Sequence, residues 1–132
     1  MKIIRTEELR GTDREVISPD GWTSVRWLLA KDGMGYSFHE TTFPPGLECD
    51  MWYKYHLEAV FCYQGEGSIV NRETGEEHKI EPGTVYALDQ HDKHTLKAKT
   101  EMKLVCVFNP PVTGREIHDE DGAYAPPDEA GA

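Results

Sequence analysis

Two short stretches of the chain hold most of the residues that could do chemistry. They read GLECDMWYKYHLEAVFCYQGEG, over residues 46–67, and PGTVYALDQHDKH, over residues 82–94. Their oxygen and nitrogen donors include Glu58, Tyr86, His56, His91 and His94. Carboxylate, phenolate and imidazole groups are ligands for divalent transition metals. The first question is therefore whether these side chains meet in one interior and hold a metal ion.

The spacing of the first stretch resembles the first metal-binding motif of the cupin family. With Gly46 as the opening glycine, the motif's glutamate falls on Glu58 and its closing glycine on Gly65. The two positions that carry histidines in that motif hold Trp52 and Lys54 instead. The frame of the motif is therefore kept, while two of its usual ligands are replaced.

The second stretch resembles the second cupin motif in the same partial way. With Gly83 as the opening glycine, the motif's histidine falls on His94. The internal proline and glycine of the motif are replaced by Asp89 and His91, and its asparagine is replaced by Ala98. One histidine of this motif therefore remains available as a metal ligand.

Glu58 and His94 alone would hold a divalent metal weakly, so a third ligand is expected from the same interior. Tyr86 is the best candidate because it precedes His94 on the neighbouring expected strand, and a phenolate oxygen suits iron. His56 and His91 are the competing candidates. One nitrogen and two oxygens fit Fe(II) better than a structural zinc site. In the alternative, the interior holds no metal, Glu58 is a buried acid paired with Lys54 or a histidine, and Tyr86 packs in the core.

Short runs of alternating apolar and polar residues, separated by Gly and Pro, predict an all-β fold. The expected strands cover residues 23–30, 36–43, 48–55, 58–65, 67–73, 77–83, 84–89, 94–100 and 103–109. Residues 5–11 are expected to form one helical turn or an edge strand. Together with the cupin motifs, this pattern predicts a single domain over residues 1–132, a cupin-type, jelly-roll-like β-barrel of short antiparallel strands with little helix.

Composition narrows the class of protein. The net charge is −10, and residues 114–132 hold six acidic residues and one basic residue, so half of the net charge lies there. Such a surface disfavours binding to nucleic acid or to an anionic membrane. No apolar run reaches the roughly 18 residues of a membrane helix, and residues 1–15 lack the apolar core of a signal peptide. Cys49, Cys62 and Cys106 have no CxxC spacing, so we expect a cytoplasmic protein without disulfides.

The similarity to known sequences extends well beyond the cupin motifs. The strings GWTSVRWLLA, GMGYSFHETT, WYKYHLEAVFCYQGEG, PGTVYALDQHDKH and LVCVFNPPVTGREIHDEDGAY resemble the ectoine synthases, in that family's order and over nearly the whole chain. The resemblance implies a hydro-lyase with Fe(II) as its cofactor, which closes N-γ-acetyl-L-2,4-diaminobutyrate into the compatible solute ectoine and releases water. It also implies a cytoplasmic homodimer, with metal ligands at Glu58, Tyr86 and His94.

Positions along the expected strands and the resemblance together assign further roles. Arg26 is expected to bind the substrate carboxylate, because its planar fork fits two oxygens. Tyr53 and Glu116 are the expected proton-transfer residues. The remaining substrate-binding residues are expected to be Trp22, His39, Thr41, Cys106 and Phe108. The residues expected to support the site without contacting the metal or the substrate are His118, Lys54, Asp92 and His56.

Two other functions fit part of the sequence. A non-catalytic cupin that binds ectoine or a related solute would need the aromatic pocket residues and Arg26, but neither Tyr86 nor the proton-transfer pair. A cupin oxygenase usually needs two or three histidines, and Trp52 and Lys54 at two of these positions argue against it. Residues 119–132 are expected to form an acidic tail with a mobile end, which acts as a lid that excludes water.

Overall fold

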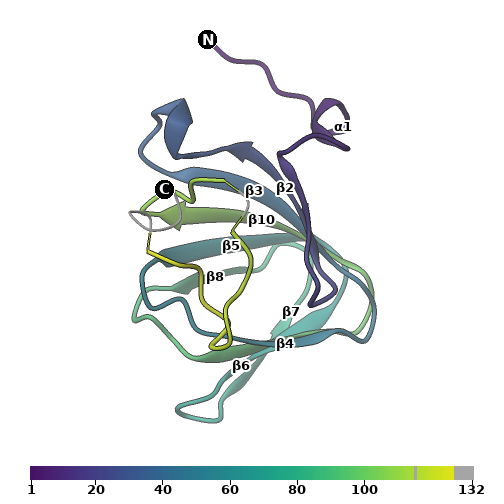
Figure 1. The fold of residues 1–132 in the computed structure, drawn as a ribbon. Helices are drawn as coiled ribbons and strands as arrows, with labels where there is room; N and C mark the ends of the chain where they lie inside the picture. The colour runs from purple at the N-terminus through teal and green to yellow at the C-terminus, as the bar shows by residue number, and fades with distance from the viewer. Residues whose placement is uncertain (115, 127–132) are drawn as a thin grey trace.

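The chain folds into two antiparallel β-sheets whose inner faces enclose one apolar core (Figure 1). This computed structural model describes residues 1–114 and 116–126. Its elements, in chain order, are α1 (Thr6–Leu9), β1 (Glu15–Ile17), β2 (Thr23–Leu28), the 3₁₀-helix η1 (Ala30–Asp32), β3 (Ser37–Phe43), β4 (Glu48–Met51), β5 (Leu57–Gln64), β6 (Gly67–Asn71), β7 (Glu77–Ile80), β8 (Val85–Leu88), β9 (His94–Ala98) and β10 (Met102–Asn109). Within the described ranges, no helix is both long and apolar enough to cross a bilayer.

The two sheets exchange strands as the chain advances. The larger sheet has the strand order β1-β2-β3-β10-β5-β8, and the smaller has the order β4-β9-β6-β7. All the strand pairs are antiparallel. Because β4, β6, β7 and β9 lie in one sheet and β5, β8 and β10 in the other, the chain crosses repeatedly between them, as in a jelly roll. The predicted all-β, jelly-roll-like architecture is confirmed.

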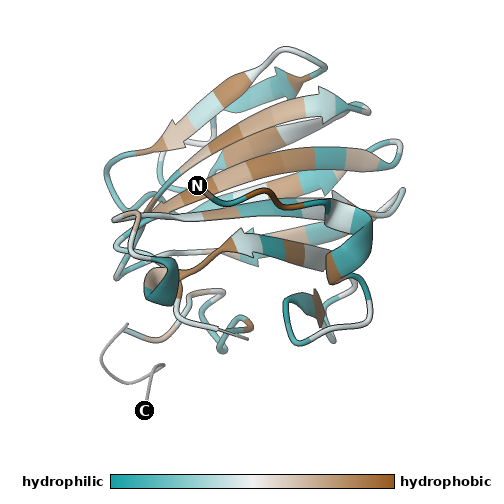
Figure 2. Ribbon diagram, turned by 90° about the horizontal axis from the view of Figure 1, so that it is seen from above, coloured by the Kyte–Doolittle hydropathy of each residue, from teal (hydrophilic) through white to brown (hydrophobic). Residues whose placement is uncertain are grey.

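Alternation along the strands decides which side chains face the core. On β5, Glu58, Val60 and Cys62 are buried while the residues between them are exposed. The same period of two buries His94 at the start of β9 and Phe108 near the end of β10. Figure 2 shows the apolar colouring concentrated on the strands. The pattern that builds the core therefore also carries polar functional groups into it.

Two strands differ from the expectation. β4 ends at Met51 rather than continuing to Tyr55. Residues 52–56 leave the sheet, and the Trp52 N–H donates to the Gly122 carbonyl 3.0 Å away instead of to a strand. The sequence pattern does not predict β1, because a strand of three residues is too short to show alternation. The stretch expected to form a helical turn or an edge strand contains the helix α1.

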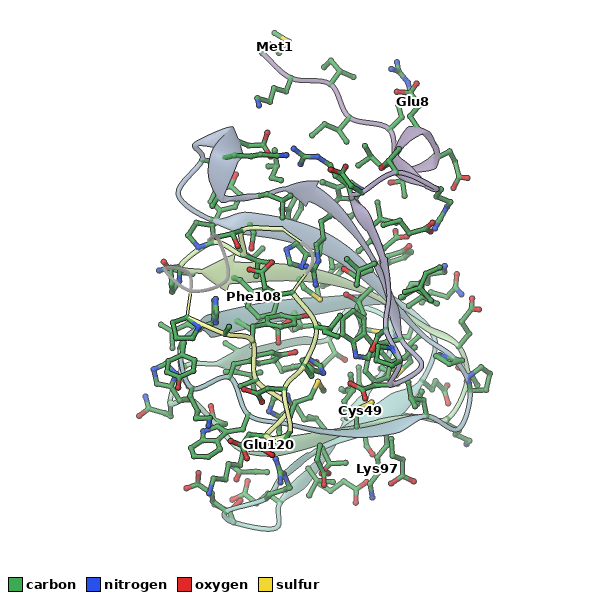
Figure 3. The ribbon with its side chains drawn as sticks, in the orientation of Figure 1. Met1, Glu8, Cys49, Lys97, Phe108 and Glu120 are labelled. Carbon is green, nitrogen blue, oxygen red and sulfur yellow. The ribbon has the colours of Figure 1, made fainter. Side chains whose placement is uncertain are left out.

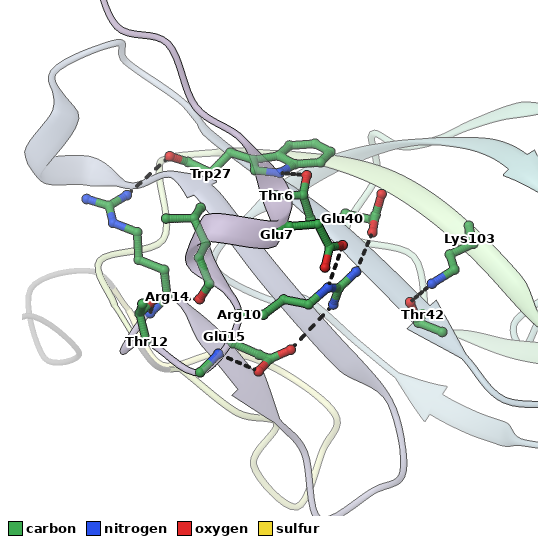
Figure 4. A network of polar contacts seen from close by, with 12 residues as sticks. Thr6, Glu7, Arg10, Thr12, Arg14, Glu15, Trp27, Glu40, Thr42 and Lys103 are labelled. Carbon is green, nitrogen blue, oxygen red and sulfur yellow. Dashed lines mark hydrogen bonds and ion pairs between the residues drawn. The ribbon is translucent and has the colours of Figure 1, made fainter.

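Polar contacts fasten α1 to the sheet (Figure 4). Trp27 of β2 donates its indole N–H to the Thr6 hydroxyl, 2.9 Å away. Arg10, just after α1, forms ion pairs with the three carboxylates of Glu7, Glu15 and Glu40. Glu7 is exposed, so that pair contributes little on its own, whereas the carboxylates of β1 and β3 join the helix to two strands.

Two glycines at the motif positions hold turns with positive φ. Gly65 has φ +90° between β5 and β6, and Gly83 has φ +96° before β8. A Cβ at Gly65 would collide with the backbone carbonyl of Glu101, whereas a Cβ at Gly83 would meet no atom within 4 Å. The two glycines therefore share a backbone requirement and differ in the space around them.

Gly65→Ala is expected to destabilise the fold more than Gly83→Ala. Both substitutions carry the cost of left-handed backbone, about 1–2 kcal/mol. Only Gly65→Ala adds overpacking against the neighbouring backbone, which costs about 1–3 kcal/mol more. Urea unfolding followed by tryptophan fluorescence measures the difference. Equal free energies of unfolding for the two variants would contradict the steric reason given for Gly65.

Candidate active site

An enclosed cavity between the two sheets contains most of the predicted site residues. Its volume is about 20 Å³, which is room for about one water molecule. Both sheets and the C-terminal segment, residues 110–114 and 116–126, contribute to its wall. The predicted residues that line it are Trp22, Thr41, Tyr53, Glu58, Tyr86, Cys106 and Phe108. The predicted residues outside this lining are Arg26, His39, His94 and Glu116.

The register of β5 and β8 places Glu58 and Tyr86 on one inward face. Glu58 lies opposite Leu88, and Tyr86 lies opposite Val60, so the two are diagonal neighbours. Both line the enclosed cavity. Tyr86 also lines a neighbouring hollow of about 150 Å³ together with His94, which begins β9 on the facing sheet. Tyr86 therefore lines one space together with Glu58 and a second space together with His94.

His94 presents a nitrogen that is free for a ligand. The residue is 1% exposed. Its Nδ1 lies 2.9 Å from the carbonyl oxygen of Asp92, so Nδ1 carries the proton and donates it to that oxygen. Within residues 1–114 and 116–126, its buried Nε2 has no hydrogen-bond partner. Histidines that bind metals commonly donate their other ring N–H to a carbonyl in this way.

The two oxygen donors, Glu58 and Tyr86, line the enclosed cavity, and a cation bound beside them would favour their ionised forms. Burial raises the pKa of Glu58 to about 8, while a hydrogen bond from the Cys106 thiol lowers it in part. Burial and the nearby Glu58 carboxylate raise the pKa of the Tyr86 phenol well above its usual value. In the described ranges no cluster of three His, Cys, Asp or Glu side chains is placed to hold a metal, so a site here depends on the phenol. The donor set of Glu58, Tyr86 and His94 fits a metal ion, because a positive charge offsets both desolvation costs.

Aromatic rings form another part of the cavity wall. Phe108, labelled in Figure 3, meets the ring of Tyr53 edge-on, with 5.1 Å between centroids and 83° between planes. The ring of Tyr124 lies 5.3 Å from that of Phe108, and the ring of Trp22 lies 5.1 Å from that of His118. The structure therefore places Trp22 and Phe108 where aromatic walls are expected.

Tyr53 carries the hydroxyl group that is bonded to a histidine at the cavity wall. Its oxygen lies 2.6 Å from Nε2 of His118, and both residues line the cavity. Burial raises the pKa of Tyr53 well above its usual value, so the phenol is protonated at neutral pH. Burial lowers the pKa of His118 to about 4, so its imidazole is neutral there. The pair can pass a proton without either member starting out charged.

β3 and β10 supply the remaining predicted pocket residues. The Cys106 thiol lies 3.7 Å from the Thr41 hydroxyl, and both line the cavity. His39 pairs with Cys106 in the register of the two strands, and its ring centroid lies 5.3 Å from that of Phe108. His39 is 1% exposed, and its Nε2 has no hydrogen-bond partner within the described residues. His39 thus stands behind Phe108 rather than at the cavity surface.

Arg26 and Glu116 hold the C-terminal segment in place. The guanidinium of Arg26 is 0% exposed and donates to the backbone carbonyls of Gly114 and Glu116, and to the hydroxyl of Tyr124. The Glu116 carboxylate accepts the N–H groups of Thr113 and Gly114, at 2.7 and 2.6 Å, and lies 3.6 Å from Arg26. Figure 1 shows this segment, in yellow, passing across the strands of the larger sheet. These contacts tie it to β2.

Tyr124 is a wall residue that the sequence reasoning missed. It is 4% exposed, belongs to the core and lines the cavity. Its only sequence signal is one aromatic residue in the acidic, Gly- and Pro-containing stretch DEDGAYAPP, where a solvated tail has no need of one. The part of the expected mobile end at residues 127–132 lies outside the described residues.

The supporting residues stand around the loops next to β4, β5 and β9. Lys54 forms an ion pair with Asp121, 2.6 Å away, rather than with Glu58. His56 is buried but precedes β5, so it is not on an unbroken strand with Glu58. His91 has a positive φ of 50° and a contact of 2.9 Å from Nδ1 to the Tyr53 carbonyl. Tyr86 lines both the cavity that holds Glu58 and the hollow that holds His94, whereas His56 and His91 line neither, which favours Tyr86 as the third ligand.

Comparison with known sequences identifies the family of the chain. A family model described as ectoine synthase matches residues 1–128. The chain belongs to the ectoine synthase family. A protein of Alkalilimnicola ehrlichii named L-ectoine synthase is 61% identical over 125 residues, which cover 94% of each sequence. Another L-ectoine synthase, from a Marinomonas species, is 57% identical over 118 residues, covering 89% of this chain and 92% of that protein.

Solved structures of ectoine synthases and other cupins share the fold. The crystal structure of ectoine synthase from P. lautus matches with a TM-score of 0.81 at 47% identity, covering 86% of this chain and 80% of that one. An RmlC-like cupin from Shewanella frigidimarina matches with a TM-score of 0.68 at 15% identity, covering 83% and 91%. The second likeness shows the fold alone. The predicted cupin-type barrel of an ectoine synthase family member is thereby confirmed.

Arg26→Lys is expected to loosen the C-terminal segment without unfolding the barrel. Lysine keeps the charge but cannot donate to two carbonyls and a hydroxyl at once. The amide of Trp52, which bonds to Gly122 of this segment, is expected to exchange hydrogen about tenfold faster or more, because one or more buried hydrogen bonds are lost.

The matched control for this prediction is Arg14→Lys. Arg14 also donates to a carbonyl, that of Trp27, and to the carboxylate of Asp32, but it does not contact the C-terminal segment. Hydrogen exchange read by mass spectrometry should therefore show the change at Trp52 in the Arg26 variant alone. Unchanged exchange in Arg26→Lys would contradict the proposed anchoring.

Proposed function

We propose that this chain catalyses the ring closure of N-γ-acetyl-L-2,4-diaminobutyrate to ectoine with release of water, using Fe(II). The observation that carries the proposal is the buried, unpartnered Nε2 of His94, in a chain of the ectoine synthase family. His94 lines a hollow together with Tyr86, and Tyr86 lines the enclosed cavity together with Glu58. The reaction makes the chain a carbon–oxygen hydro-lyase that serves compatible-solute synthesis under osmotic stress.

The reaction sets clear demands on the site. The α-amine must lose a proton before it attacks the carbonyl carbon of the acetamide, and the resulting hemiaminal must lose its oxygen as water. An amide is a poor electrophile, so its oxygen needs polarising. Fe(II) held by Glu58, Tyr86 and His94 would supply that polarisation as a Lewis acid, worth several kcal/mol of charge stabilisation. The remaining demands are proton transfer and folding of the flexible substrate into a ring-like shape.

The aromatic wall meets the demand for shape. Trp22 and Phe108 line the cavity, so they can press a short chain with a positive end into a bent conformation. A cation against such a ring gains on the order of 1 kcal/mol. Thr41 and Cys106 line the same cavity and offer a hydroxyl and a thiol to the polar groups of the substrate. His39 lies behind Phe108, so it would reach the substrate only if that ring moved aside.

Arg26 is our candidate for the substrate carboxylate. Its guanidinium is occupied by two backbone carbonyls of the C-terminal segment, so the carboxylate would have to exchange with them. The cavity, with a volume of about 20 Å³, also requires the segment to move, because the substrate is many times larger than one water molecule. We therefore propose that the C-terminal segment moves to admit substrate and then closes as a lid, which excludes water from the dehydration.

Tyr53 and Glu116 are the proposed proton-transfer residues. Tyr53 has direct access, because it lines the cavity and its hydroxyl is bonded to His118. Glu116 would reach the substrate only after releasing the N–H groups of Thr113 and Gly114. The geometry thus favours Tyr53 for the step that occurs with the segment closed.

The cytoplasm is the proposed location of the protein. The three cysteines, Cys49, Cys62 and Cys106, are free thiols. Free thiols persist in the reducing cytoplasm, and the excess of acidic residues keeps a protein hydrated where solutes accumulate.

We also propose a homodimer, with β8 at its interface. β8 is one of the two edge strands of the larger sheet, the other being β1, and Val85 on β8 is 63% exposed. Phe61 and Tyr63 on the neighbouring β5 are each 42% exposed. An exposed edge with an apolar face favours pairing with a second copy.

Sedimentation velocity should show a dimer that Val85→Lys weakens and Met34→Lys, at an exposed loop position, leaves intact. A monomeric wild-type protein would contradict the proposal.

A turnover assay tests the reaction and the cofactor together. Protein stripped with a chelator is given N-γ-acetyl-2,4-diaminobutyrate with and without Fe(II), and ectoine is quantified by chromatography. We expect Fe(II)-dependent product, and a loss of about a hundredfold or more for Glu58→Ala and for His94→Ala, because each removes one of three ligands.

Metal content and folding serve as controls for this assay. Iron measured by absorption spectroscopy should fall in both ligand variants, while their circular dichroism matches that of the wild type. If the protein binds ectoine but makes no product with any added metal, the proposed enzyme is wrong and the protein is a solute-binding cupin. Full activity without any metal would remove Fe(II) from the proposal and leave the ring closure in place.

A further inference from the structure

A second hollow lies on the other side of His118 from the enclosed cavity. Its volume is about 240 Å³, and carboxylates dominate its lining, which includes Asp20, Glu48, Asp50, Asp119 and Glu120. Cys49 and Glu120, which also line it, are labelled in Figure 3. Within residues 1–114 and 116–126, His118 is the one residue that lines both this acidic hollow and the enclosed cavity.

The imidazole of His118 connects the two spaces atom by atom. Its Nε2 lies 2.6 Å from the Tyr53 hydroxyl, on the cavity side. Its Nδ1 lies 3.6 Å from Oδ2 of Asp20, on the hollow side. The His118 side chain is 4% exposed and the Asp20 side chain is 47% exposed. A buried ring therefore stands between a phenol inside the barrel and a carboxylate in contact with solvent.

The turn between β1 and β2 fixes the place of Asp20. The Asp20 N–H donates to the Ser18 hydroxyl, 2.9 Å away. The Ser18 N–H donates to the Trp22 carbonyl, and Gly21, with φ +110°, donates its N–H to the Ser18 carbonyl. Trp22 itself is core and packs against His118. The backbone that carries Asp20 is thus tied to the residue against which the imidazole rests.

We propose that Asp20 is a positioning residue for the ring closure, which keeps the proton of neutral His118 on Nδ1 and stabilises the imidazolium that forms during turnover. The inference rests on the proposed function. A carboxylate opposite Nδ1 favours the tautomer in which Nδ1 is the donor, as in other histidine–carboxylate pairs. Nε2 then accepts the Tyr53 hydroxyl proton, so the lone pairs of the Tyr53 oxygen are left to accept a proton from the substrate.

The proton balance of the reaction explains why such a holding site is useful. The attacking nitrogen starts as an ammonium group with three protons and ends as an amidinium nitrogen with one. The bond from this nitrogen to the acetamide carbon forms, the carbon–oxygen bond breaks, and both lost protons leave with the oxygen as water. The reaction takes no net proton from solvent and releases none to it, so the protein can hold each proton between its removal and its delivery.

The surroundings of His118 make the imidazolium hard to form without help. Burial, His94 and Arg26 lower the pKa of His118 to about 4, and Asp119 opposes them. The rings of Tyr53 and Tyr124 also pack against it, and neither is charged at neutral pH. Asp20 is the carboxylate paired with the ring across Nδ1. Because Asp20 is half exposed, it leaves the resting imidazole neutral and acts when the positive charge appears.

The test compares Asp20→Asn with Glu48→Gln in the Fe(II)-loaded enzyme. Each variant removes one carboxylate charge from the same hollow, but only Asp20 pairs with His118 in the structure. We expect kcat of Asp20→Asn to fall about tenfold or more, with KM changed by no more than about twofold, because proton transfer is impaired and substrate contacts are kept. Glu48→Gln should match the wild type, and Asp20→Glu should recover part of the loss.

Nitrogen NMR of His118 gives a second measurement that does not depend on turnover. In the wild type the ¹⁵N shifts should report a protonated Nδ1, and in Asp20→Asn this signature should be lost. Equal kcat in Asp20→Asn and wild type, an equal fall in Glu48→Gln, or unchanged ¹⁵N shifts would overturn the inference. A wild-type protein that makes no ectoine would instead overturn the proposed function, and the ¹⁵N shifts alone would then decide the pairing of Asp20 with His118.

Discussion

Several polar groups of this protein are buried without hydrogen-bond partners, and the rest of the structure depends on this constraint. Buried polar atoms in folded proteins are nearly always hydrogen-bonded. In the described part of this chain, Nε2 of His94, Nε2 of His39 and the Trp22 indole N–H are buried without a partner, while Glu58 stands in the same interior with a raised pKa. Such groups are costly in an empty barrel and useful in one that holds a metal ion and a polar substrate. The fold therefore gives up stability around the cavity that a ligand can restore.

The C-terminal segment completes the enclosure, and one buried cation holds it. Arg26 reaches from β2 to two carbonyls and a hydroxyl of the segment, and Tyr124 brings an aromatic ring into the core behind it. The segment also buries Val112 and Ala123, each 0% exposed, so opening costs both hydrogen bonds and apolar burial, which substrate binding has to offset. A substrate carboxylate offers Arg26 the same kind of acceptor that the segment offers, so binding and opening can compensate each other.

The strand pattern allowed much of the fold and of the site to be predicted. Glu58, His94 and Phe108 face inward because they stand at alternate positions of strands whose apolar residues also face inward. The predicted end of β4 was wrong, because Trp52 bonds to Gly122, seventy positions later, and local alternation cannot predict so distant a partner. Tyr124 was missed for the same reason. Arg26 and Glu116 each bond to backbone groups of the C-terminal segment, and residue types alone could not show those partners.

His118 unites these features, since it lines the cavity, packs against Trp22 and belongs to the segment that closes the barrel. When the segment is in place, its imidazole meets both the Tyr53 hydroxyl and the Asp20 carboxylate. If the segment leaves, both contacts are lost together, and the phenol inside the barrel has no base beside it. Closure would then assemble the proton-holding pair at the moment when water is excluded, which links the movement that admits substrate to the chemistry that follows.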